Sequence, residues 1–203
     1  MLIFLLGVPT VALANYFDGG VGTQSNIRGA DATIGTANYP AVYDNFSCAW
    51  SMVANTDAQG THIQVGWMKR YASAVEYFFE YANDGEPFHR NFTFWGPAQN
   101  SSHDYKVVLQ NGTWYGTADG AQIGTVSDSN ILWTPNSVHY AGEIVNYNQA
   151  FPGQTNNHVP FTNVKYLNGS TWVTPSLSKV SDYEGGFSWI TVGSEFDIWD
   201  QRY

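Results

Sequence analysis

Polar side chains that could do chemistry occur inside segments that are otherwise apolar. Gln64 lies in Thr-His-Ile-Gln-Val-Gly-Trp-Met, and Glu143 stands between Ala-Gly and the apolar pair Ile-Val. Glu76 and Glu80 lie in Val-Glu-Tyr-Phe-Phe-Glu-Tyr-Ala. A carboxylate can act as a general base or acid, and an amide N–H can stabilise an oxyanion. An isolated polar residue on a strand more often just faces solvent, so the residues alone leave both roles open.

Other catalytic and metal-binding signatures do not occur in the sequence. There is no nucleophile elbow around a serine, no phosphate-binding glycine loop and no His-Glu-x-x-His motif. The five histidines, at positions 62, 89, 103, 139 and 158, are scattered along the chain. Cys48 is the only cysteine, and its apolar neighbours predict that it is buried. We therefore predict no metal site and no cofactor.

Charge excludes several classes of partner. The 203 residues include only 8 Lys and Arg, and they give a formal net charge of −9 and a pI of about 4.7. Binding to nucleic acid or to an anionic membrane needs a basic surface, so neither partner is expected. The sequence is instead rich in Tyr, Trp and Asn, side chains that stack on sugars and hydrogen-bond to them. A carbohydrate-binding role therefore stays open.

The first residues indicate export. Residues 1–14, MLIFLLGVPTVALA, are apolar and end in small residues, as a signal peptide and its cleavage site do. The stretch is too short to span a membrane, and a buried N-terminal strand is its alternative interpretation. We predict a secreted monomer with no membrane association after signal removal. Residues 15–46 are predicted to be an extended lead-in with at most one edge strand, and residues 47–203 a single domain.

Many short strands must position the candidate residues. Asn-Gly dipeptides at 111–112 and 168–169 predict two hairpins, and at most one short helix is expected, within 128–136. This pattern predicts an all-β fold with little or no helix, either a two-sheet antiparallel β-sandwich of the concanavalin-like or jelly-roll type or a closed barrel; the sandwich is preferred. The predicted strands are Cys48–Ala54, Thr61–Met68, Val75–Ala82, Phe92–Trp95, Tyr105–Leu109, Thr113–Thr117, Gln122–Val126, Glu143–Tyr147, Val164–Leu167, Thr171–Thr174 and Phe196–Trp199.

Alternation along the strand that carries Gln64 separates a core face from a polar face. Ile63, Val65 and Trp67 are predicted to share one face. Gln64 then points to the opposite face, beside Gly66, which leaves room above the sheet.

These segments resemble a known group of enzymes. Ile-Gln-Val-Gly-Trp at 63–67, Phe-Glu-Tyr at 79–81 and Gly-Glu-Ile-Val-Asn at 142–146 are similar to motifs of the neprosin family of glutamic peptidases. The segments Ala-Phe-Pro-Gly-Gln-Thr at 150–155 and Val-Pro-Phe-Thr at 159–162 are similar to the segment that follows the second catalytic Glu of that family. Where neprosins have their first Glu this chain has Gln64, and a Gln/Glu pair is the catalytic pair of the related eqolisins, which are β-sandwiches of about this size.

The resemblance implies a hydrolase, a secreted acid endopeptidase that acts on polypeptides. Glu143 would be the general base that activates water, and Gln64 would stabilise the oxyanion of the tetrahedral intermediate. Trp67, Glu80, Tyr81 and Tyr147 would line the substrate subsites. An acidic pH optimum is expected, because the carboxylate acts as a base only when it is ionised while acid assistance favours low pH.

Besides a structural or coat protein, two other functions are consistent with the sequence. One is a non-catalytic sandwich that binds carbohydrate or a cell surface. The other is a jelly-roll enzyme that cleaves glycosides with Glu80 and Glu143 as its two carboxyl groups, which would then lie about 5–9.5 Å apart. The arrangement of Gln64, Glu80 and Glu143 on one face of a sheet separates these possibilities.

Overall fold

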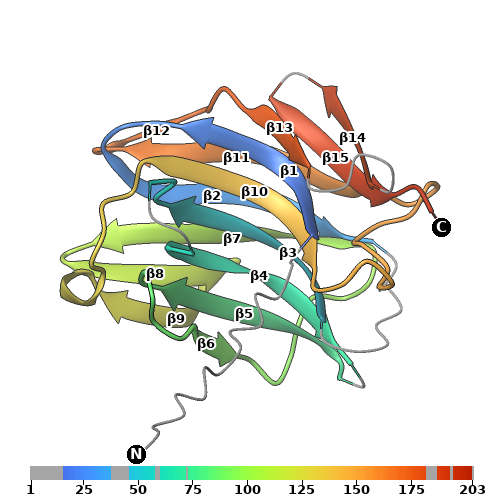
Figure 1. Ribbon diagram of the computed structural model, residues 1–203, viewed down its shortest axis with the longest axis horizontal. Helices are drawn as coiled ribbons and strands as arrows, with labels where there is room; N and C mark the ends of the chain where they lie inside the picture. Colours follow the sequence, from blue (N-terminus) through green and yellow to red (C-terminus); the bar gives the residue numbers. More distant parts are fainter. Residues whose placement is uncertain are drawn as a thin grey trace, which may run out of the picture.

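Two antiparallel sheets stack face to face in the computed structural model (Figure 1). The structure describes residues 16–37, 46–57, 60–71, 73–181, 187–192 and 194–202. The predicted signal peptide, residues 1–14, lies outside the described residues. Within the described part of the chain, no helix is long and apolar enough to cross a membrane. The predicted two-sheet β-sandwich is confirmed.

One sheet has seven strands, and in Figure 1 it lies in front, with β6 at one edge and β13 at the other. All of its neighbouring strands pair in antiparallel fashion. Its strands in order are β13 (Ser178–Ser181), β1 (Tyr16–Thr23), β10 (Ser137–Ile144), β3 (Phe46–Ala54), β4 (His62–Arg70), β5 (Val75–Ala82) and β6 (His89–Phe92).

The second sheet has eight strands and packs behind the first (Figure 1). One of the eight, β12 (Thr171–Val173), pairs only with β11 and lies off the main path. The others in order are β14 (Phe187–Val192), β15 (Glu195–Asp200), β11 (Val159–Asn168), β2 (Ile27–Thr36), β7 (Ser101–Gln110), β8 (Thr113–Ala118) and β9 (Ala121–Ser127).

Both predicted hairpins form. Asn111 and Gly112 connect β7 to β8, and both have positive φ, as a type I′ turn requires. β11 and β12 form the second hairpin, with Gly169 and Ser170 in its turn rather than Asn168. The helix expected within 128–136 is a single 3₁₀ turn, Asp128–Asn130.

The prediction for residues 15–46 was wrong. This segment contains two full strands, β1 and β2, and each lies in the interior of a different sheet. β1 pairs with β10 and β13, while β2 pairs with β7 and β11. Gly, Ala and Thr are frequent in both strands, so the apolar alternation is weak, although each strand pairs with neighbours on both sides.

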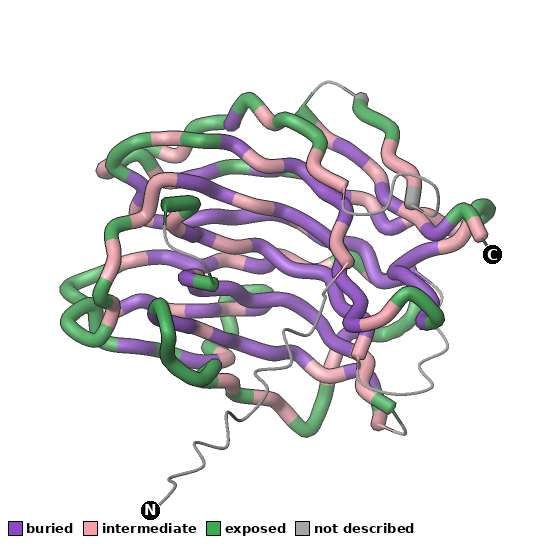
Figure 2. The backbone as a smooth tube through the Cα atoms, in the orientation of Figure 1, coloured by how far each residue is buried: buried purple, intermediate pink, exposed green. Residues whose placement is uncertain are grey.

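The main core lies between the two sheets. Figure 2 shows buried backbone along the middle of the strands and exposed residues at the turns. The predicted alternation on β4 is confirmed, because Ile63, Val65 and Trp67 belong to this core and are fully buried. A smaller apolar cluster, which includes Trp50 and Phe78, covers the outer face of the seven-stranded sheet.

Candidate functional site

A cleft of about 300 Å³ opens on the outer face of the seven-stranded sheet. Strands β1, β3, β4, β5, β6 and β10 each supply at least one side chain to it. Gln64, Glu80 and Glu143 all line this cleft, together with Phe17, Trp50, Met52, Gly60, His62, Phe88, Arg90 and His139.

The register of the strands places Gln64 in the cleft. Gln64 on β4 is directly opposite Met52 on β3 and Glu80 on β5, and Glu80 is opposite Arg90 on β6. Directly paired residues of antiparallel strands project to the same face. The four side chains therefore form one row across the outer face.

Glu143 enters the cleft from β10, opposite Phe17 of β1 and Cys48 of β3. Its side chain accepts a hydrogen bond from Trp50 Nε1, with 3.0 Å between Nε1 and Oε2. Burial raises the pKa of Glu143 to about 6, against the hydrogen bond from Trp50, and the negative charge of Glu80 contributes in the same direction as burial. Glu143 can therefore take up and release a proton under mildly acidic conditions.

Glu80 is the acceptor at the centre of a hydrogen-bond cluster. Gln64 Nε2 and His62 Nε2 each lie 2.8 Å from Glu80 Oε1, and Arg90 Nε donates to Oε2. Burial by itself would raise the pKa of this carboxyl group. The hydrogen bond and charge of His62, with those of Arg90, outweigh burial and hold the pKa of Glu80 below its ordinary value.

This ionised carboxylate orients the Gln64 amide. A carboxylate only accepts hydrogen bonds, so it fixes the NH₂ end of the amide toward Glu80. Among the described residues, neither the second N–H nor the carbonyl oxygen of Gln64 has a further partner, so both are left for a ligand in the cleft. Gly66 lies two residues further along β4 on the same face, and Trp50 of β3 is paired with it. Because Gly66 has no side chain, nothing from this position fills the space beside Gln64.

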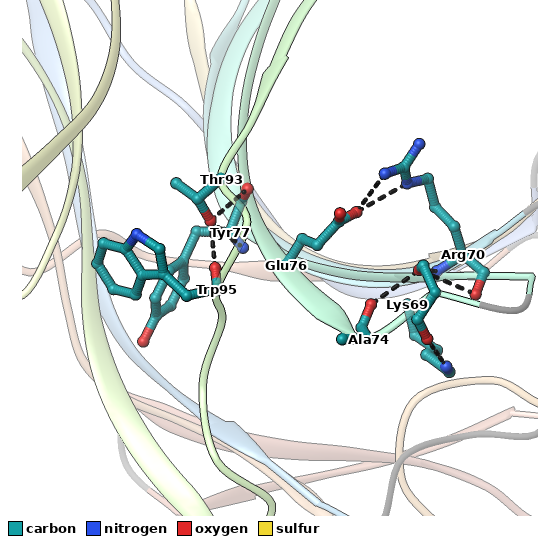
Figure 3. Close-up of polar contacts among 8 residues, drawn as sticks. Lys69, Arg70, Ala74, Glu76, Tyr77, Thr93 and Trp95 are labelled. Carbon is teal, nitrogen blue, oxygen red and sulfur yellow. Dashed lines mark hydrogen bonds and ion pairs between the residues drawn. The ribbon is translucent and has the colours of Figure 1, made fainter.

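Glu76 has a different setting, although it lies on the same face of β5. Figure 3 shows Glu76 turned toward Arg70, whose Nε and Nη2 lie 2.8 and 2.5 Å from Oε2. Tyr77, the next residue, projects to the other side of the strand, where its ring contacts Trp95 with 5.0 Å between the ring centroids. Glu76 and Arg70 do not line the cleft.

Three of the predicted substrate-binding residues lie elsewhere. Trp67 is fully buried between the sheets, and its Nε1 donates to Gly35 O, so it has no surface to offer a substrate. Tyr81 projects from the opposite face of β5 to Glu80 and stacks on His89. Tyr147 follows β10 and is 40% exposed, but it does not line the cleft.

Several residues that line the cleft were not predicted as site residues from the sequence. His62 could have been found, because it alternates with Gln64 on one strand. Trp50 could also have been found, because it alternates with Cys48 and Met52 along the outer face of β3. Arg90 could not, because β6 was predicted at 92–95 and its pairing with Glu80 depends on the register of a neighbouring hairpin. No group of three or more metal-ligating side chains occurs among the described residues.

Comparison with known proteins gives a fold but no close sequence relative. No family model matches the chain, and no curated protein matches it. Among solved structures, scytalido-glutamic peptidase bound to a peptide-based transition-state analogue is similar with a TM-score of 0.67 at 13% identity. SCP-B, a member of the eqolisin family in complex with the tripeptide Ala-Ile-His, is similar with a TM-score of 0.64 at 14% identity. Both comparisons cover 92% of this chain and 98% of the other. The chain therefore has the fold of the eqolisin glutamic peptidases.

Proposed function

We propose that the protein is a secreted endopeptidase in which Gln64 and Glu143 activate water for peptide hydrolysis. The observation that carries this proposal is that both side chains line one cleft on the outer face of the seven-stranded sheet. The solved structures with the same fold are peptidases with a transition-state analogue or a tripeptide bound, which supports a polypeptide substrate. Secretion is supported by the sequence of residues 1–14 alone, and the monomeric state remains a prediction.

The proposed reaction needs only the side chains of this chain and one water molecule. Glu143 removes a proton from the water as its oxygen bonds to the carbonyl carbon of the substrate. The second N–H of Gln64, the one not bonded to Glu80, donates to the oxyanion that forms. Glu143 then returns its proton to the leaving amine nitrogen as the C–N bond breaks, which restores the carboxylate.

The pKa of Glu143 sets the acid limb of this reaction. A general base must be ionised, and the pKa of Glu143 is about 6. We therefore expect kcat/KM to rise with pH up to about 6, so the acidic optimum expected from the sequence should lie near this value. A profile of kcat/KM between pH 3 and 8 checks this. If kcat/KM instead increased as the pH was lowered below 5, Glu143 would work as a protonated acid in the first step.

Substitution of the two residues tests the assignment directly. Glu143→Gln keeps the shape and removes the base, so hydrolysis of an unfolded protein substrate should fall on the order of 10³-fold. Gln64→Ala should fall by about 10²-fold or more, because the oxyanion loses its donor. Glu76→Gln is the matched control on the same sheet face and should retain activity. Peptidase activity that survives in Glu143→Gln, with the control active, would refute the assignment.

The contacts of Glu80 argue against the glycosidase alternative. A second catalytic carboxyl group would need an oxygen free to act on the substrate. Glu80 Oε1 already accepts from Gln64 and His62, and Oε2 accepts from Arg90. The arrangement suits an orienting group for Gln64 rather than an acid or a nucleophile.

A further inference from the structure

The two ends of the cleft differ in charge. Around Glu143 the walls are mainly apolar and include Phe17 and Trp50. At the other end, His62 and Arg90 both contact the single carboxylate of Glu80. Side chains around Glu80 have little exposure, with His62 at 13% and Arg90 at 25%. We refer to His62, Phe88 and Arg90 as the cationic end of the cleft.

Both ring nitrogens of His62 lie within hydrogen-bond distance of an acceptor. Its Nδ1 lies 3.1 Å from the carbonyl oxygen of Gly60, and its Nε2 lies 2.8 Å from Glu80 Oε1. Neither partner can donate a hydrogen bond, so both bonds form together only when both ring nitrogens carry a proton. Two cations then surround one carboxylate, which leaves one positive charge in excess.

The other titratable groups that line the cleft do not cancel this excess in acid. Burial lowers the pKa of His139 to about 4, with help from the charge of His62, so His139 is neutral above that pH. Glu143 becomes ionised only as the pH rises through about 6. In its ionised form, which the proposed reaction requires, Glu143 balances this excess over the cleft as a whole, so recognition of an anion depends on the local donors of Arg90.

Arg90 has donors left over for a ligand. Among the described residues only its Nε makes a hydrogen bond, to Glu80. The two terminal nitrogens carry four further N–H groups in one plane, a geometry that matches a carboxylate. Phe88 is 56% exposed beside His62, with 5.7 Å between the ring centroids, and offers an apolar wall for methylene groups.

We propose that the cationic end is a subsite that selects an acidic side chain, Glu or Asp, of the peptide substrate close to the scissile bond. The ligand carboxylate would bind the terminal nitrogens of Arg90 while the main chain of the substrate passes Gln64. This inference rests on the proposed peptidase function and adds its substrate class.

Paired peptides test the subsite. Internally quenched peptides with amidated C-termini are made in pairs that differ only in carrying Glu or Gln at one position. This position is moved in single steps across the scissile bond from one pair to the next. The value of kcat/KM is measured for each peptide at pH 6. We expect the Glu peptide to be favoured by about tenfold at one position. Arg90→Gln should reduce this ratio to near one, and Arg90→Lys should keep part of it. His62→Gln removes the other cation and should also lower the ratio.

Arg70→Gln is the matched control. Arg70 forms the same kind of carboxylate pair, with Glu76, on the same sheet face (Figure 3). Its guanidinium lies over Phe92, and it does not line the cleft. Its substitution should leave the Glu/Gln ratio unchanged. Because only the ratio is read, a general loss of activity in Arg90→Gln does not imitate the expected result.

The outcomes separate the two proposals. Cleavage of all peptides with equal rates for Glu and Gln overturns the subsite and leaves the peptidase function intact. The same holds if a preference for Glu survives in Arg90→Gln. If the wild type cleaves none of the peptides, the proposed peptidase function is refuted. The subsite is then tested by binding of the same peptide pairs to Glu143→Gln, measured by calorimetry. Equal binding there overturns it, and tighter binding of the Glu peptide supports it.

Discussion

At the scale of single residues, the site depends on two carboxyl groups that experience opposite environments. Glu143 accepts hydrogen bonds from the neutral donors Trp50 and Cys48, and burial raises its pKa to about 6. Glu80 is surrounded by cations that keep its pKa low. Groups with pKa values driven apart in this way can divide the work, one holding a proton in transit and the other staying charged to orient an amide.

Removal of the Trp50 donor should move the pH profile. In Trp50→Phe the aromatic wall remains, but Glu143 loses the hydrogen bond that opposes burial, so its pKa should rise further. We expect the acid limb of kcat/KM to shift to higher pH, with a smaller change in the rate on the plateau. Phe78→Leu, in the same outer cluster but away from the carboxyl group, serves as the control. An unchanged limb in Trp50→Phe would contradict this account of Glu143.

At the scale of the elements, β4 links the core to the cleft. One face packs against the second sheet, while the other carries Gln64 and, two residues later, Gly66. A Cβ added to Gly66 would lie 2.0 Å from Ala49 O and 2.8 Å from Trp50 Cα. Only glycine therefore allows β3 and β4 to approach each other at this point.

Gly66→Ala should separate β3 from β4 beside the site. We expect a loss of stability of about 1–3 kcal/mol and a larger relative loss of activity, because Trp50 and Gln64 lie on the two strands concerned. Denaturant unfolding and kcat/KM measure the two effects. Gly85→Ala is the comparison: its Cβ would meet nothing within 4 Å, so only the positive φ of 72° costs energy. An equal cost at both positions would count against the steric explanation.

Many of the strands and turns could be predicted from the sequence. The predictions that failed concern strands whose local pattern is weak or whose partners lie far along the chain. Alternation of side chains on β4 and the Asn111-Gly112 turn are local properties, and both predictions were confirmed. Strand β10 was predicted at 143–147 but covers Ser137–Ile144, because the histidine and glycine before Glu143 hide an alternating strand. The interior positions of β1 and β2 depend on partners far along the chain, and no local pattern encodes these partners.

At the scale of the whole molecule, buried acids favour the folded state at low pH. Burial raises the pKa of Asp18 to about 6, against the charge of Lys179. Burial, followed by contact with Asp104, raises the pKa of Asp31 to about 7. Between the ordinary value of 3.8 and these values the folded state binds more protons than the unfolded chain, so stability falls as pH rises. The lowered pKa of His139 acts in the opposite direction between pH 6.5 and about 4.

Thermal unfolding should show this balance as a Tm that falls between pH 4 and pH 7. The side chain of Asp18 is fully buried, and Lys179 Nζ lies 3.9 Å from its Oδ1. Its contribution to the fall is on the order of 3 kcal/mol, at 1.36 kcal/mol for each pKa unit. Asp18→Asn should therefore flatten the curve, whereas Asp84→Asn in an exposed turn should not. A wild-type Tm that rises over this range would rule out the explanation.

The interior position of β1 also determines when the site can exist. Phe17 of β1 lies opposite Glu143 of β10, so the first described strand meets its partner only after most of the chain has been made. Contacts between such distant segments form slowly, because a long loop must close before any pairing is gained. During synthesis the growing chain therefore holds Gln64 and its neighbours without Glu143. A proteolytic activity assembled in this order would be silent until β10 has been made and paired with β1.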